Sequence, residues 1–299
     1  MKRLILVVGI GGVLMTGSAF GIDEKAGTSA ACFLKVGTSV RSAGMGGAGI
    51  ALAEGVDGLS LNPAALAGSK SREATFMHHN WLCEVSFNYL AGNWSTGNQA
   101  VACGVNLVGT GKQKRTTYST PDGDEEFKTG GLILTVGYAR EINKQIRAGA
   151  SLKYISQELD DETGKGAGLD IGILYRPRIK DLTLGAVIQD IGITKIKFVE
   201  KEENLPLQIR VGAGYKIKKA LVSIDVSKPN DNSIRFNLGG QYQIHPALAI
   251  RAGYDSSIDE GPGVTAGFGV TYKNLTFDGA YLPQGELADT FRLSASIRF

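Results

Sequence analysis

Apolar and polar residues alternate with a period of two from about residue 72 to the end of the chain. In the last such segment one face carries Phe291, Leu293, Ala295, Ile297 and Phe299, and the other carries Arg292, Ser294, Ser296 and Arg298. This is the side-chain period of a β-strand, whereas a helix repeats every 3.6 residues. The pattern therefore predicts an all-β protein whose strands bury one face and expose the other.

Clusters of Gly, Pro, Asn and Asp divide the alternating region into about fourteen strands of roughly 8–13 residues. They are expected near 72–80, 84–92, 98–110, 128–139, 145–158, 164–176, 181–190, 207–216, 219–227, 233–244, 247–256, 262–273, 274–283 and 289–298. No helical stretch interrupts them, and parallel strands need long crossover connections. We therefore expect an antiparallel up-and-down meander.

Alternation alone leaves open a soluble sandwich or a membrane barrel, because both have one apolar face. The connections differ in length at the two ends of the strands. Tight connections are expected near 140–144, 177–180, 217–218, 245–246 and 273–274, and long ones near 111–127 and 191–206. Short turns at one end and longer loops at the other are typical of an outer-membrane barrel.

Aromatic residues lie near the strand ends on the apolar face. Near the tight turns these are Tyr138, Tyr175, Tyr215, Tyr242 and Tyr272, and near the longer loops Tyr154, Tyr254 and Tyr281. Amphipathic rings favour the two membrane interfaces. The terminal Phe299 resembles the signal that the barrel-assembly machinery reads. We predict a transmembrane β-barrel over 71–299, in the outer membrane of a Gram-negative-type bacterium, surrounded by its lipid.

The composition excludes several other classes. Of the 299 residues, 43% are hydrophobic and 20% charged, which excludes wholesale disorder. The mean hydropathy of −0.02 is too polar for a helical membrane protein. The formal charge of +3 includes no basic block, so no nucleic-acid partner is expected.

Residues 1–21 have the features of a secretory signal peptide. Lys2 and Arg3 precede an apolar run, and Ser18 to Gly21 offer small residues for cleavage after Gly21. An exported chain is expected.

If the apolar face meets lipid, the opposite face lines a lumen. The charged residues expected there are Arg147, Lys153, Asp170, Arg210, Asp225, Arg235, Arg251, Asp278 and Arg292. Two interpretations remain open: an anion-favouring pore, or charges that pair with each other and with a plug. Pairing is favoured because buried charges need partners, and inward glycines such as Gly149 and Gly253 allow another backbone to approach the wall.

Residues 22–70 are rich in Gly, Ala and Ser and lack the strand pattern, which makes them the expected hatch or plug. The residues singled out in this segment are Arg41, Gly44, Met45, Gly46, Asp57, Asn62 and Pro63. The glycine-rich stretch is no phosphate loop, because it lacks Gly-Lys-Ser/Thr after a strand.

Several motifs together resemble FadL-like outer-membrane proteins, and most closely the PorV/PorQ branch. They are Arg41–Gly46 followed by Asn62–Leu66, Tyr138–Arg140, Gly149–Tyr154, Asp170–Gly172, Leu205–Pro206, Arg251–Tyr254 and Gly267–Gly269. The resemblance implies a fourteen-stranded barrel with an N-terminal hatch. It further implies passage of hydrophobic or amphipathic molecules across or into the outer membrane. The alternative it implies is a non-transporting barrel that binds secreted proteins in a type IX-like export system.

No enzymatic site, metal site or cofactor is expected. His78 and His79 are neighbours on a strand and point to opposite faces, and no Gly-x-Ser-x-Gly elbow occurs. The spacing of Cys32, Cys83 and Cys103 fits no metal site.

Overall fold

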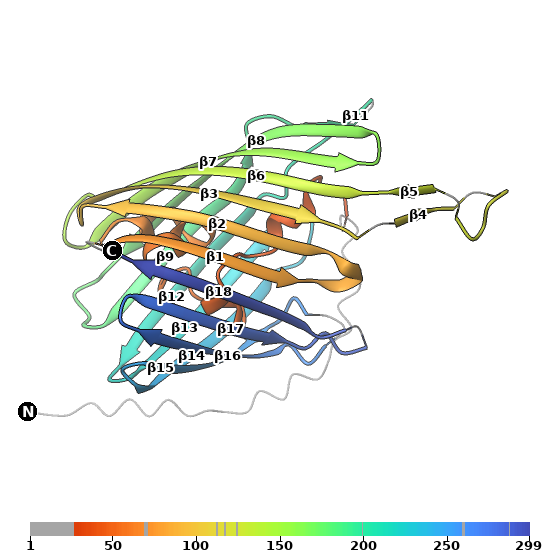
Figure 1. The fold of residues 1–299 in the computed structure, drawn as a ribbon. Coiled ribbons are helices and arrows are strands. Elements are labelled where there is room, and N and C mark those ends of the chain that lie inside the picture. The colour runs from red at the N-terminus through yellow and green to blue at the C-terminus, as the bar shows by residue number, and fades with distance from the viewer. Residues whose placement is uncertain are drawn as a thin grey trace, which may run out of the picture.

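Fourteen strands close into one antiparallel barrel within the residues that the computed structural model describes, which are 27–68, 71–111, 113–116, 118–123, 125–198, 200–258, 261–286 and 288–299 (Figure 1). The expected signal peptide, 1–21, lies outside these residues. The barrel strands are β1 Arg72–Asn80, β2 Ser86–Ser95, β3 Gln99–Gly109, β6 Thr129–Glu141, β7 Ile146–Leu159, β8 Glu162–Tyr175, β9 Leu182–Gly192, β12 Gln208–Ile217, β13 Ala220–Pro229, β14 Arg235–His245, β15 Leu248–Asp255, β16 Val264–Tyr272, β17 Leu275–Leu282 and β18 Thr290–Arg298. The predicted fold class is confirmed.

The barrel closes where the first strand meets the last. β1 pairs antiparallel with β18, from Glu73 opposite Arg298 to Asn80 opposite Phe291. Closure satisfies the backbone groups that an open edge would leave unpaired in lipid.

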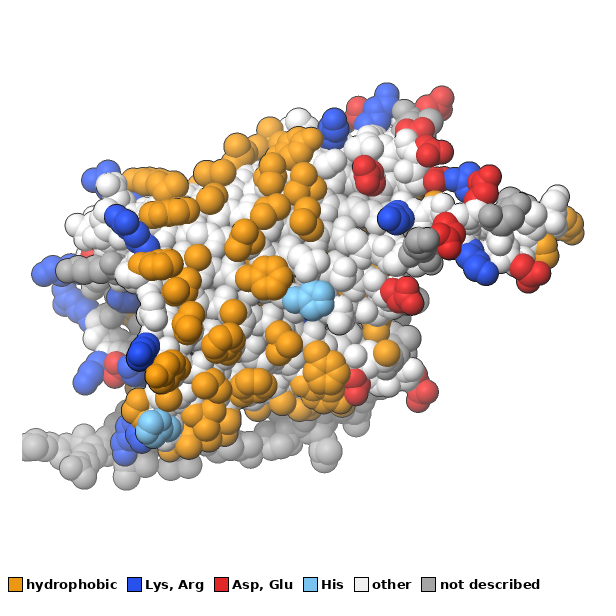
Figure 2. All heavy atoms as spheres, in the orientation of Figure 1, with side chains coloured by type: hydrophobic (Ala, Val, Ile, Leu, Met, Phe, Trp, Pro, Cys, Tyr) orange, Lys and Arg blue, Asp and Glu red, His pale blue; other side chains and the backbone are white. Residues whose placement is uncertain are grey.

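The outer surface of the barrel is apolar. Alternate side chains of the strands point outward. Many of them are large and hydrophobic and are exposed on the outer surface, such as Val136 (58% exposed) and Leu293 (58% exposed). Figure 2 shows them as a band that crosses the strands, with charged side chains gathered beyond its two ends. A continuous exposed apolar surface on a closed barrel is the surface that a bilayer covers.

Two long connections form additional hairpins. β4 Gln113–Arg115 pairs with β5 Glu125–Phe127, and β10 Ile196–Phe198 pairs with β11 Lys201–Glu203. The sequence predicts long connections at 111–127 and 191–206, and both connections are long, but the short hairpins within them were not predicted. Each strand has three residues, too few for a period of two to stand out. In Figure 1, β4 and β5 project away from the barrel.

Residues 27–68 lie inside the barrel and are called the lumenal segment below. They form short helical turns, η1 Cys32–Lys35, α1 Val40–Ala43, η2 Gly55–Asp57, α2 Gly58–Leu61 and η3 Pro63–Leu66, and a further turn, η4 Leu82–Glu84, joins β1 to β2. None of the helices in the described part of the chain is long and apolar enough to cross a bilayer.

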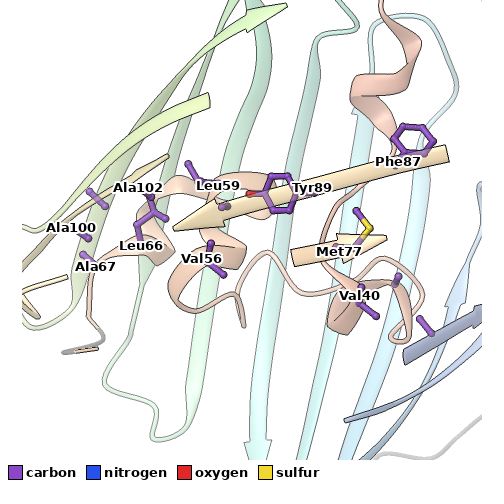
Figure 3. Packing of buried hydrophobic residues seen from close by; sticks show 14 of the residues in the cluster. Val40, Val56, Leu59, Leu66, Ala67, Met77, Phe87, Tyr89, Ala100 and Ala102 are labelled. Atoms are coloured by element: carbon purple, nitrogen blue, oxygen red, sulfur yellow. The ribbon is translucent and has the colours of Figure 1, made fainter. Parts of the chain in front are cut away.

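A hydrophobic core joins the lumenal segment to the inner wall. Val40, Val56 and Leu59 of the segment pack with Met77 of β1 and Phe87 of β2 (Figure 3). Burial of each such side chain contributes about 1.5–3 kcal/mol. The lumenal segment and the inner wall of the barrel therefore share one hydrophobic core.

Candidate functional site

The candidate site is the contact between the lumenal segment and the barrel wall. Local signals shape the segment: Ser39 caps α1 by accepting a hydrogen bond from the Ser42 nitrogen at 3.2 Å. Asn62 caps η3 in the same way, accepting from the Ala64 nitrogen at 3.1 Å, with Pro63 at the first position of the turn.

Glycines of the wall let the segment's backbone approach closely. A Cβ on Gly253 would lie 2.6 Å from the Met45 carbonyl oxygen, and one on Gly149 would lie 2.6 Å from that of Pro63. Real side chains do not approach this closely. Gly44 similarly lies against Gly267 of β16. Residues 44–46 and 63 of the segment therefore pack directly against the backbone of the barrel wall rather than against its side chains.

Polar side chains of β14 and β16 bind the backbone of the segment at Gly46, next to Met45. The Gly46 nitrogen donates to Thr265 Oγ1 at 2.9 Å, and Asn237 Nδ2 donates to the Gly46 oxygen at 2.6 Å. Met45 itself is fully buried. Both backbone groups of Gly46 thereby find partners without water.

Asp225 and Arg210 form a second attachment. Asp225 Oδ2 accepts hydrogen bonds from the backbone nitrogens of Gly49 at 2.9 Å and Ile50 at 3.1 Å. Arg210 donates to the Gly47 oxygen at 2.9 Å and pairs with Asp225 at 3.3 Å. Asp225 is fully buried, so its charge depends on these donors.

Asn62 forms a third attachment. Its side-chain amide donates to the carbonyl oxygens of Ile173 at 3.1 Å and Ala186 at 3.4 Å, on two adjacent strands. It also reaches the Ile50 oxygen at 3.4 Å within the segment. Asn62 is completely buried, and one amide thus connects two parts of the segment to the wall.

Two arginines hold the segment's backbone, one at Gly37 and one near its C-terminal end. Arg292 of β18 donates to the Gly37 oxygen at 2.8 Å, and Arg147 of β7 donates to the Ala67 oxygen at 3.2 Å. Near the start, Lys35 pairs with Asp231 at 2.5 Å. The segment is therefore attached along its whole length.

A polar cavity of about 260 Å³ separates the segment from the wall near the short turns. Arg41 and Arg251 both donate to Gln241 Oε1, at 3.1 Å and 2.9 Å. Arg251 also pairs with Asp278 at 2.6 Å. Asp57 of η2 lines the same cavity.

Burial raises the pKa of Asp57 to about 6, and the carboxylates of Glu73 and Asp278 act in the same direction. The Arg41 guanidinium and the Ser39 hydroxyl oppose the rise. Asp57 is therefore a titratable group of the lumenal segment that responds near neutral pH.

Lys153 lies in a buried charge cluster at a bulge between β8 and β9. Its Nζ is 2.6 Å from Asp190 Oδ1 and 2.9 Å from Asp170 Oδ2. The Asp190 nitrogen donates to Asp170 Oδ1 at 2.8 Å, and Asp190 has a φ of 57°. The bulge turns Asp190 inward together with Gln189, against the alternation. Sequence periodicity could not have placed Asp190 here.

Arg235 differs from the other inward charges. It lies on the lumenal side of β14 near the long loops and is half-buried. It forms no ion pair with any described residue.

A second cavity, of about 50 Å³, lies between the segment and β3, β6 and β7. Among the described residues around it, Thr38 Oγ1, Tyr89 OH and Asn106 Oδ1 are buried without a hydrogen-bond partner. Sequence reasoning missed all three: Tyr89 and Asn106 occupy ordinary inward positions of β2 and β3, and Thr38 lies in the segment without a strand pattern.

The remaining predicted residues lie apart from this site. Phe299 is exposed at the short-turn end, where its nitrogen donates to the Arg72 oxygen at 2.9 Å. His78 bonds Asn88 at 2.9 Å, while His79 is buried on the lumenal side. The described residues contain no cluster of three His, Cys, Asp or Glu that could hold a metal ion.

Comparisons with known proteins identify relatives by structure. No protein-family model and no curated protein matches the chain. The toluene transporter TodX of Pseudomonas putida is similar, with a TM-score of 0.63 and 14% identity over 88% of this chain and 97% of that one. A Pseudomonas aeruginosa FadL homologue has a TM-score of 0.62 and 11% identity over 87% and 98%. A TodX deltaS2S3 mutant, a monoaromatic hydrocarbon channel, has a TM-score of 0.63 and 12% identity over 88% and 98%.

These likenesses concern the fold. The chain has a FadL-like fold, as the sequence motifs predict. With its closed barrel and apolar exterior, it is a bacterial outer-membrane β-barrel.

Proposed function

We propose that this protein is a plugged outer-membrane channel that passes hydrophobic or amphipathic molecules across or into the outer membrane. The observation that carries the proposal is the lumenal segment, which fills the barrel and is held by Asp225, Asn62 and Arg292. In this proposal the segment is the hatch that the sequence predicts.

The way the segment is attached supports a movable hatch. Besides the hydrophobic core, its polar contacts with the wall are hydrogen bonds and ion pairs from single side chains, and the 260 Å³ cavity lies beside it. Each such hydrogen bond contributes a net stabilisation of about 1 kcal/mol. A limited shift of the segment breaks only a few of them at a time.

The class of molecule is proposed from two observations. The fold is shared with TodX, a toluene transporter. The two cavities that described residues line beside the segment, of about 260 and 50 Å³, are too small for a large hydrated solute. An apolar molecule needs no hydration shell and can pass through a transient gap.

Vesicle uptake tests this proposal. Lipid vesicles holding the folded full chain should take up a hydrophobic fluorescent reporter faster than empty vesicles, and exclude a charged dye of similar size. Asn62→Ala, which loosens the segment, should change hydrophobic uptake several-fold. Asn274→Ala, in an exposed turn, should leave it unchanged. Equal uptake by loaded and empty vesicles would refute the proposal.

A PorV-type role in protein export is the second candidate. The β4–β5 hairpin favours it, because it projects from the barrel and presents a fully exposed Tyr118 near its tip. Exposed aromatic side chains are common anchors in protein interfaces. Mass spectrometry of the gently solubilised native protein should find bound secreted proteins if this role holds, and Tyr118→Ser should remove them. A chain that carries only lipid would exclude it.

A further inference from the structure

Basic side chains are concentrated on one arc of the short-turn rim. Three consecutive turns around the barrel, β6–β7, β8–β9 and β12–β13, connect six adjacent strands. Their exposed bases are Arg140, Lys144, Arg176, Arg178, Lys180, Lys216, Lys218 and Lys219. These eight residues are called the basic arc below. In Figure 2, Lys and Arg side chains gather beyond this end of the apolar band.

The basic arc lacks internal neutralisation. None of its eight side chains forms an ion pair with another described residue. Of the two acidic residues in these turns, Glu141 pairs with Arg147 at 3.4 Å, and Asp181 is exposed. At the opposite ends of these strands the charges are mixed, and the β7–β8 turn there is acidic, with Glu158, Asp160, Asp161 and Glu162.

Exposed isoleucines accompany the bases. Ile142 and Ile179 are each 61% exposed and Ile217 is 50% exposed, one in each turn. The aromatic row of Tyr138 and Tyr215 lies immediately next to them on the strands. Three exposed isoleucines would contribute nothing to the binding of a soluble anion. Bases that alternate with apolar side chains beside an aromatic row suit the headgroup layer of a membrane.

We propose that the basic arc binds the phosphate headgroups of anionic phospholipids in the membrane leaflet at the short-turn end. The bases contact the phosphates, and the isoleucines enter the adjoining acyl region. Each Lys or Arg near an anionic lipid surface strengthens attraction about fivefold. The arc would thereby collect anionic lipid beside β6 to β13 rather than around the whole barrel.

Native mass spectrometry of the folded full chain in mixed micelles tests the proposal. The probes are phosphatidylglycerol and, as the neutral comparison, phosphatidylcholine. The wild type should retain phosphatidylglycerol preferentially. Replacing Lys144, Arg178, Lys180, Lys218 and Lys219 by Gln should reduce that preference at least tenfold.

The matched control removes the same charge from the opposite rim, at Lys114, Lys128, Lys165, Lys195 and Lys197, and should keep the preference. Heat-dependent mobility in gels verifies that every variant is folded. An equal preference in both variants, or none in the wild type, would overturn the proposal. A second variant, Ile142→Ser with Ile179→Ser and Ile217→Ser, should also weaken retention. Unchanged retention there, with displacement by inorganic phosphate, would indicate a soluble-anion site and overturn it too.

Discussion

The Asp225 carboxylate accepts a hydrogen bond from the Ile50 backbone nitrogen at 3.1 Å, although the two residues are 175 positions apart. One residue belongs to the barrel wall and the other to the lumenal segment. Because the carboxylate also pairs with Arg210, one buried charge connects a barrel strand pair to the occupant of the lumen. The predictions below follow from attachments of this kind.

Asp225→Asn should release the middle of the lumenal segment. The change removes the charge that Arg210 and two backbone donors share, and it leaves the guanidinium unpaired. Breaking a buried pair in this way costs about 3 kcal/mol. Limited proteolysis should cut the segment faster, and the thermal midpoint should fall. Asp181→Asn, on an exposed turn, is the control, and equal effects of both changes would contradict the assignment.

Gly253→Ala should displace the segment at Met45. The added methyl group would overlap the Met45 backbone, and overpacking of this kind costs about 2 kcal/mol. Gly240→Ala is the matched control, since a Cβ there meets its nearest atom at 3.8 Å. Thermal unfolding in detergent should separate the two variants. If Gly253→Ala is as stable as Gly240→Ala, the Met45 backbone does not pack directly against Gly253.

Asp57 should make stability fall as pH rises from about 4 to about 6. Burial raises the pKa of Asp57 to about 6 from an ordinary value of 3.8, so in this window the folded protein binds more protons than the unfolded chain. Stability is therefore higher below this window and lower above it. Asp57→Asn should remove this component and stabilise the protein at pH 7. The measurement is the difference in thermal midpoint between wild type and variant across this range; a difference that does not change with pH would reject the role of Asp57.

Lys153→Met should destabilise the bulge between β8 and β9. The change leaves Asp170 and Asp190 facing each other without their shared cation, at a cost of about 3 kcal/mol. Lys165→Met, which removes an exposed charge on β8, should change stability by less than about 0.5 kcal/mol. Denaturant unfolding in detergent measures both, and equal midpoints would show that Lys153 does not hold the cluster.

The barrel could be predicted from the sequence because its main determinant is local. Alternation specifies which residue of each strand faces the lumen. It places Arg210 and Asp225 on one face, and in the structure the two side chains pair at 3.3 Å. The ends of strands depend on pairing as well. The second strand, expected near 84–92, runs from Ser86 to Ser95 because it pairs with β1 and β3 over that range.

The partners within the lumen could not be predicted. Which carbonyl Asn62 reaches depends on strands more than a hundred positions away. Asp190 was missed because a bulge breaks the period of two. The unpartnered hydroxyl of Tyr89 was missed because only the packed structure reveals what surrounds it.

Single-channel conductance in planar bilayers tests the central claim, that the lumenal segment closes the barrel, most directly. The full chain and a chain lacking residues 37–66 are inserted, with heat-dependent gel mobility as the check that both barrels are folded. The full chain should show no steady ion current, and the shortened chain should show discrete open steps. Identical traces from two folded barrels would contradict the claim.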